Sequence, residues 1–185
     1  MNSKKVQMLV FGGLFSAIAF VLYLFEIPFI GHLKLDISDI PALLGSIVFT
    51  PVFGIVVELV KNLLELLVRG LGAQMGFGNI MNFSVGCAYV IPFALIWRKK
   101  TNAKGFALAA ICGLFSIVVI GLAGNALIVP PYFRFFLHTE IDSATLKGAI
   151  LSATALNAVK GAILTAVAYP LIQLSHIFKK IMKNN

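Results

Sequence analysis

Long apolar stretches separated by short polar segments constrain this chain more than any other feature. A helix that spans a membrane needs about 20 mostly apolar residues, and runs of this kind recur along the whole sequence. The 185 residues are 59% hydrophobic and only 12% charged, with a mean hydropathy of +0.97. Soluble domains carry about 25% charged residues, so this chain has too little polar surface to cover a water-facing globule. The sequence therefore predicts an all-α integral membrane protein with a single membrane-embedded domain over residues 1–185.

The apolar runs predict six transmembrane helices, at residues 6–26, 39–50, 52–69, 79–97, 105–128 and 146–178. The second helix is short, with Asp39 as a candidate cap and Pro41 in its first turn. Segment 27–38 alternates in a way that favours an extended loop or a short hairpin, and the glycine-rich segment 70–78 predicts a flexible lid. Pro130 and Pro131 are expected to end the fifth helix.

The basic residues predict the orientation in the membrane, because cytoplasmic loops are enriched in lysine and arginine. They gather before the first helix, between the fourth and fifth, and after the sixth: Lys4, Lys5, Arg98, Lys99, Lys100, Lys104, Lys179, Lys180 and Lys183. Six crossings place these three groups on one side, so both termini are expected to be cytoplasmic. The net charge of +8 then describes one membrane face, and no nucleic acid is expected as a partner.

Ionisable side chains inside the predicted helices are candidate functional groups, because burying them in a membrane is costly. On the third helix, spacings of three and four bring five such side chains to one face: Glu58, Lys61, Asn62, Glu65 and Arg69. The spacing allows Lys61 and Glu65 to pair across one turn. This polar face is predicted either to join the helix to its neighbours or to contact a ligand directly.

A second polar face lies on the sixth helix, where Asn157 and Lys160 are one turn apart. Lys160 is about 13 residues from the outer end, roughly 20 Å deep, so it needs a partner or a water-filled cavity. Asn79, Asn82 and Asn125 lie near the outer ends of the fourth and fifth helices. A polar set confined to the outer half predicts a pocket that is open outside and closed below, whereas a pore needs polar lining at both depths.

The first helix carries two overlapping pairs of small residues at a spacing of four, Gly12 with Ser16 and Gly13 with Ala17. Small residues let membrane helices approach closely. The spacing alone fits a contact within the chain or a partner protein equally well.

Several catalytic motifs do not occur in the sequence. It contains no GxxxxGK[ST], HExxH or nucleophile elbow, and its histidines are scattered, so neither ATP hydrolysis by a P-loop nor a metal site is expected. The chain is therefore not expected to be an enzyme. A small intramembrane enzyme that uses Glu58, or Asp36 and Asp39, as acid or base is the alternative from another class.

Four segments, at residues 35–45, 54–62, 78–86 and 157–160, resemble the substrate-binding S components of energy-coupling factor (ECF) vitamin transporters, in particular the riboflavin-binding type. The resemblance implies six helices and a vitamin site near the outer face, covered by the loop between the first two helices. It implies that Asn157, Lys160 and Asn125 contact the ribityl chain or the ring edge. Five further residues are predicted to contribute to ligand binding: Asn82, Asn79, Asp36, Glu58 and Lys61.

The same resemblance implies the partners and the cellular location. The chain is expected in the prokaryotic plasma membrane, with riboflavin as transported ligand and no cofactor. Gly12, Gly13, Ser16 and Ala17 would dock on a transmembrane coupling protein that works with two cytoplasmic ATPases. Another vitamin, such as thiamin, or a queuosine precursor is the alternative within the class, although a cationic ligand is not expected beside Lys160. A stand-alone facilitator is a further alternative.

Overall fold

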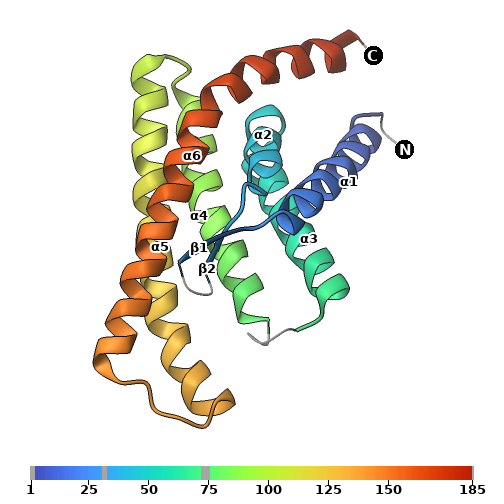
Figure 1. Cartoon of the computed structure of the whole chain (residues 1–185). Coiled ribbons are helices and arrows are strands. Elements are labelled where there is room, and N and C mark those ends of the chain that lie inside the picture. Colours follow the sequence, from blue (N-terminus) through green and yellow to red (C-terminus); the bar gives the residue numbers. More distant parts are fainter. Residues whose placement is uncertain (1–2, 31–32, 72–75, 185) are drawn as a thin grey trace.

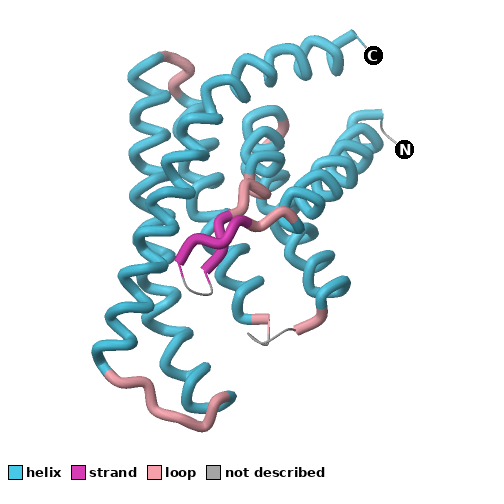
Figure 2. The backbone as a smooth tube through the Cα atoms, viewed as in Figure 1, coloured by secondary structure: helices cyan, strands magenta, loops and turns pink. Residues whose placement is uncertain are grey.

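The computed structural model describes residues 3–30, 33–71 and 76–184. In this part of the chain the structure has six helices and one two-stranded antiparallel hairpin (Figures 1 and 2). Their order is α1 (Ser3–Leu24), β1 (Ile27–Ile30), β2 (Leu33–Leu35), α2 (Ile40–Val48), α3 (Pro51–Arg69), α4 (Phe77–Lys99), α5 (Ala103–Phe136) and α6 (Ser143–Asn184).

The short helix α2 lies at the centre of the bundle. It contacts α1, α3, α4 and α6, and residues 41–48 are all buried. A helix that is apolar on every side is stable only when neighbours cover all of it. Helices α4, α5 and α6 pack against one another in sequence order, and α3 packs between α4 and α1. The hairpin crosses the middle of the molecule and contacts α6 (Figure 2).

Four of the helices are long and apolar enough to cross a membrane, so the prediction of six spans is wrong although the number of helices is six. The four candidate spans are Lys5–Leu24, Phe77–Lys99, Ala103–Phe136 and Ser143–Ser175. Helix α2 has 9 residues, about 14 Å at 1.5 Å per residue. Helix α3 has 19 residues but carries Glu58, Lys61, Glu65 and Arg69. Helix count and span count therefore differ, because α2 is too short to cross a membrane and α3 carries four charged side chains.

Both termini and the α4–α5 connection lie at one end of the molecule, whereas the α3–α4 and α5–α6 connections lie at the other (Figure 1). The three basic groups of the sequence thus belong to one end. That this end is cytoplasmic stays a prediction.

Local sequence signals fix the starts of α3 and α5. The hydroxyl of Thr50 accepts a hydrogen bond from the amide of Phe53 at 3.1 Å and Pro51 opens α3, while Asn102 caps α5 by accepting from Gly105 N at 2.8 Å. The expected hairpin is present, with Ile27 opposite Leu35. Parts of the two expected loops, residues 31–32 and 72–75, lie outside the described residues.

The prediction that Pro130 and Pro131 end the fifth helix is wrong, because α5 continues through both to Phe136. Proline keeps a φ compatible with a helix and removes one backbone hydrogen bond each time. The last turn is held instead by aromatic packing: the ring of Phe136 lies 5.6 Å from that of Phe77 and 6.0 Å from that of Tyr132, measured between centroids.

Candidate ligand-binding site

Lys160 lies on α6 and is 5% exposed. Its ammonium nitrogen is 3.1 Å from Oδ2 of Asp36 and 2.9 Å from Oδ2 of Asp39. Both aspartates belong to the segment that joins the hairpin to α2. The sequence predicted that this buried lysine needs a partner. Its partners are the two carboxylates of this segment, which lies far from Lys160 along the chain.

A second buried lysine, Lys61 of α3, shares one of these carboxylates. Its nitrogen lies 2.7 Å from Oδ1 of Asp39 and 2.6 Å from Oε2 of Glu58, and all three side chains are fully buried. The ring of Tyr23 covers the same ammonium group at 5.5 Å from its centroid. The pairing of Lys61 with Glu65 that the spacing allows is not formed, because Glu65 contacts Asn79 and Arg69.

Asp36 connects this ionic network to the hairpin and to α4. Its carboxylate accepts hydrogen bonds from the amide and the hydroxyl of Ser38 and, at 3.1 Å, from Nδ2 of Asn82. Burial alone would raise the pKa of Asp36, but Lys160 and Lys61 hold it well below its usual range. The carboxylate is therefore ionised at neutral pH and holds the segment before α2 in place.

The asparagines of α3 and α4 extend the network toward the α3–α4 connection. Asn62 donates to the carbonyl of Glu58 at 2.9 Å and to Oδ1 of Asn82 at 3.4 Å. Asn79 donates to the carbonyl of Asn62 at 3.2 Å. These amides make a continuous polar path from the two lysines to one end of the bundle.

Two further asparagines meet at Gly121 of α5. The amide of Asn125 donates to the carbonyl of Gly121 at 2.7 Å, and the side chain of Asn157 lies so close that a methyl group on Gly121 would be 1.8 Å from its Nδ2. Asn157 is buried and lies one turn from Lys160 on α6. The side chains of Asn125 and Asn157 thus both lie against Gly121 of α5.

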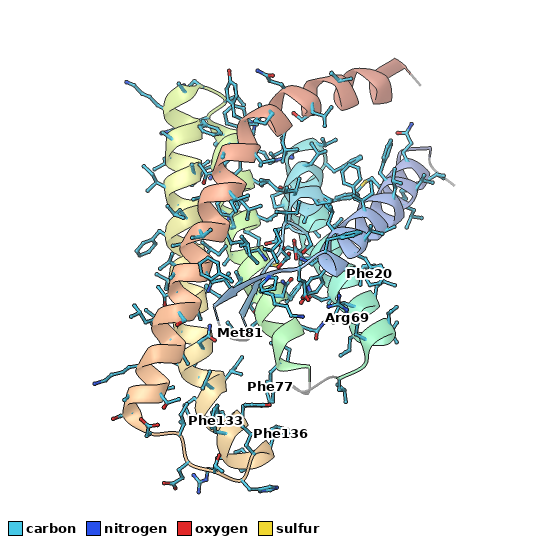
Figure 3. All side chains as sticks on the ribbon, in the orientation of Figure 1. Phe20, Arg69, Phe77, Met81, Phe133 and Phe136 are labelled. Atoms are coloured by element: carbon cyan, nitrogen blue, oxygen red, sulfur yellow. The ribbon has the colours of Figure 1, made fainter. Side chains whose placement is uncertain are left out.

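Aromatic side chains gather beyond the charged network, toward the α5–α6 connection. In Figure 3, Arg69 lies beside the central group of polar side chains, whereas Phe77, Phe133 and Phe136 lie nearer that connection. The ring of Phe77 is 6.3 Å from that of Tyr132. Ligand sites typically combine apolar walls with a few orienting polar groups, and this end of the molecule offers both.

Hydrogen bonds and ion pairs connect six of the predicted binding residues into one network. They are Asp36, Glu58, Lys61, Asn79, Asn82 and Lys160. Asn157 and Asn125 each lie against Gly121 of α5 instead. Within the described part of the chain no group of His, Cys, Asp and Glu side chains has a metal-binding arrangement.

The role of Asp39 in the structure differs from the helix-capping role that the sequence predicted. It precedes α2 as expected, but its side chain makes no capping hydrogen bond and reaches the two lysines instead. The sequence features that could have indicated this pairing are the two buried lysines and the Asp-x-x-Asp spacing. The expectation that no cationic ligand binds beside Lys160 stays a prediction, and the charge of the lysine alone does not decide it, because three carboxylates surround Lys61 and Lys160.

The two small-residue pairs of α1 face different surroundings. Ser16 is buried, and a methyl group on Gly12 would touch the ring of Phe53 of α3 at 3.7 Å. Gly13 and Ala17 are exposed, and no atom lies within 4 Å of the position of a methyl group on Gly13. The first pair thus serves packing within the chain, and the second presents an open surface.

Comparisons with known proteins assign this arrangement to a family. The family model for the substrate-specific component of ECF transporters matches residues 7–172. The chain is 33% identical over 168 residues to riboflavin transporter FmnP of Bacillus subtilis (strain 168), covering 88% of each chain. It is 32% identical over 189 residues to riboflavin transporter RibU of Staphylococcus aureus (strain TCH60), covering 98% of this chain and 97% of the relative.

A solved structure of the S component of a bacterial ECF transporter has the same fold. It superposes with a TM-score of 0.76 at 26% identity, over 94% of this chain and 98% of that one. Sequence and fold agree over nearly the full length, and the chain therefore belongs to the substrate-specific components of ECF transporters.

Proposed function

We propose that this chain captures riboflavin and delivers it to an ATP-driven importer. The observation that carries the proposal is its similarity, over most of both chains, to two proteins named riboflavin transporters. Four apolar helices and the family make it a multi-pass protein of the cell membrane. The relatives are named transporters, and an intramembrane enzyme is not favoured, since Glu58 is fully buried and already paired with Lys61.

The chemistry of the site supports this ligand. Riboflavin has a flat, largely apolar ring system and a chain of hydroxyl groups. Phe77, Tyr132 and Phe136 offer an apolar wall for the ring, while Asn157, Asn125 and Lys160 offer donors and acceptors for the hydroxyls. Such hydroxyl recognition discriminates strongly, because a ligand lacking the hydroxyls leaves buried polar groups unpaired.

The hairpin and its following segment are proposed to cover the bound vitamin. They are tied to α6 through the pair of Lys160 with Asp36, and to α4 through Asn82. Riboflavin would enter from the end opposite the termini, where the predicted outer loops lie. The buried pair of Glu58 and Lys61 on α3 then forms the floor of the site, and Asp36 belongs to the covering segment.

Transport requires partners that supply ATP hydrolysis. A transmembrane coupling protein with two cytoplasmic ATPases is the proposed set, and the exposed Gly13 and Ala17 of α1 are the proposed contact with the coupling protein. The membrane lipid surrounds the remaining apolar helix faces.

A titration of the detergent-purified protein tests the ligand. Riboflavin fluorescence should be quenched with a stoichiometry near one at sub-micromolar concentrations, and thiamin should not compete. Thiamin is a cation, and the carboxylates of the site can balance a positive charge. Thiamin is therefore an essential comparison. Unchanged flavin fluorescence would refute riboflavin as the ligand, and competition by thiamin would assign the site to another vitamin.

A further inference from the structure

Asp39 is the point at which two buried lysines from different helices meet. Its side chain is completely buried. One carboxylate oxygen lies 2.7 Å from the ammonium group of Lys61 on α3, and the other lies 2.9 Å from that of Lys160 on α6. No other carboxylate in the described part of the chain contacts both lysines.

The sequence position of Asp39 does not account for this arrangement. An aspartate just before a helix ordinarily accepts a hydrogen bond from the first turn, yet Asp39 makes no such bond with α2. The carboxylate is committed to the lysines, while its backbone carbonyl accepts from the amide of Leu43 at 2.9 Å. The start of α2 therefore anchors the two lysines.

Charge neutralisation alone does not require Asp39. Without it, Lys61 still has Glu58 at 2.6 Å and Lys160 still has Asp36 at 3.1 Å. The second carboxylate instead restricts the orientation of the lysine side chain, because two fixed contacts restrict a long flexible side chain far more than one. A donor that is held in place before binding loses less freedom when the ligand arrives.

We propose that Asp39 is a positioning residue for ligand recognition. It fixes the ammonium group of Lys160 in the orientation that contacts the bound vitamin, and it couples that orientation to α3 through Lys61. This inference rests on the proposed function, since it assumes that Lys160 contacts the ligand. Asp39 itself acts through the lysine and does not touch the vitamin.

A double-mutant cycle tests this role. Riboflavin affinity is measured for wild type, Asp39→Asn, Lys160→Met and the double variant, with melting temperatures recorded for each. We expect Asp39→Asn to weaken binding about tenfold and Lys160→Met about a hundredfold. The double variant should bind no worse than Lys160→Met, because Asp39 has nothing left to position.

The outcomes separate positioning from general stability. Losses that multiply in the double variant would overturn the proposal, since a purely structural role of Asp39 would persist without Lys160. Asp142→Asn, which changes an exposed aspartate at the start of α6, is the control and should bind like wild type. If Asp39→Asn does not fold, Asp39→Glu takes its place in the cycle, because the longer side chain keeps the charge but changes both contacts.

The proposed function has its own readout in the same experiment. A wild-type protein that does not bind riboflavin overturns that function and the positioning role with it. A wild type that binds, together with multiplying losses, overturns only the positioning role.

Discussion

Replacing Gly121 with alanine should separate the proposed binding site from the fold. The added methyl group would lie 1.8 Å from Nδ2 of Asn157, whereas ordinary van der Waals contact begins at 3.4 Å. This amide is the free end of a side chain, so it can move aside without moving a helix. Alanine also favours a helix over glycine by about 1 kcal/mol. We therefore expect the free energy of unfolding to change by no more than about 1 kcal/mol.

The same displacement is large on the scale of a hydrogen bond. To restore ordinary contact the amide of Asn157 has to retreat from 1.8 Å to 3.4 Å. A hydrogen bond at about 2.9 Å does not survive such a shift. Losing it and leaving a buried ligand group unpaired costs about 1–3 kcal/mol, which corresponds to a Kd raised by about 5-fold to 150-fold.

The assay is titration of riboflavin fluorescence with Gly121→Ala, beside thermal unfolding in the same detergent. Gly148→Ala is the matched control, because it makes the same change on α6 where no atom lies within 4 Å of the added methyl group. Wild-type affinity and stability for Gly121→Ala would show that Asn157 does not contact the ligand. A protein that no longer folds would show that displacing the side chain of Asn157 strongly destabilises the fold.

Three further changes probe the network, the docking surface and the hairpin segment. Gly86→Ala places a methyl group 2.6 Å from Oε2 of Glu58. We expect it to break the buried ion pair of Glu58 at a cost of about 3–5 kcal/mol, which exceeds the gain in helix propensity and lowers the melting temperature. A raised melting temperature would contradict this. Ala17→Leu should abolish riboflavin uptake by cells while the purified protein keeps its Kd, and unchanged uptake would remove this face from the docking surface. Because the pKa of Asp36 is lowered in the fold, the stability it contributes should be complete above about pH 5 and fall below about pH 4; melting temperatures across this range, compared with Asp36→Asn, check the sign.

The helices and the hairpin could be predicted because their signals are local. Apolar runs of helical length, Thr50 before Pro51 and the alternation around Lys34 each act over a few residues. The end of α5 could not be predicted in the same way. Pro130 and Pro131 are strong local signals for a helix end, but the aromatic packing of Phe136 on Phe77 joins segments that are far apart in the sequence.

The partners of the buried lysines show the same limit more sharply. The depth of Lys160 predicted that it needs a partner, but Asp36 lies 124 residues away along the chain. For Lys61 the local rule favoured Glu65, one turn on. The structure pairs Lys61 with Glu58 and Asp39 instead, because Asn79 of α4 takes the carboxylate of Glu65. Spacing can place these groups on one face, whereas only the packing of α2 and α4 decides which of them meet.

The ion pairs of Lys160 define the kind of ligand atom that it can recognise. An ammonium group has three N–H donors, and Asp36 and Asp39 account for two contacts. Its charge is already balanced, so the lysine does not need an anionic ligand. The remaining donor needs only an acceptor oxygen, such as a hydroxyl or a ring carbonyl, and a ligand that supplies one leaves both ion pairs intact. An uncharged vitamin rich in such oxygens therefore suits this paired lysine, whereas an unpaired lysine at the same depth would favour a negatively charged ligand.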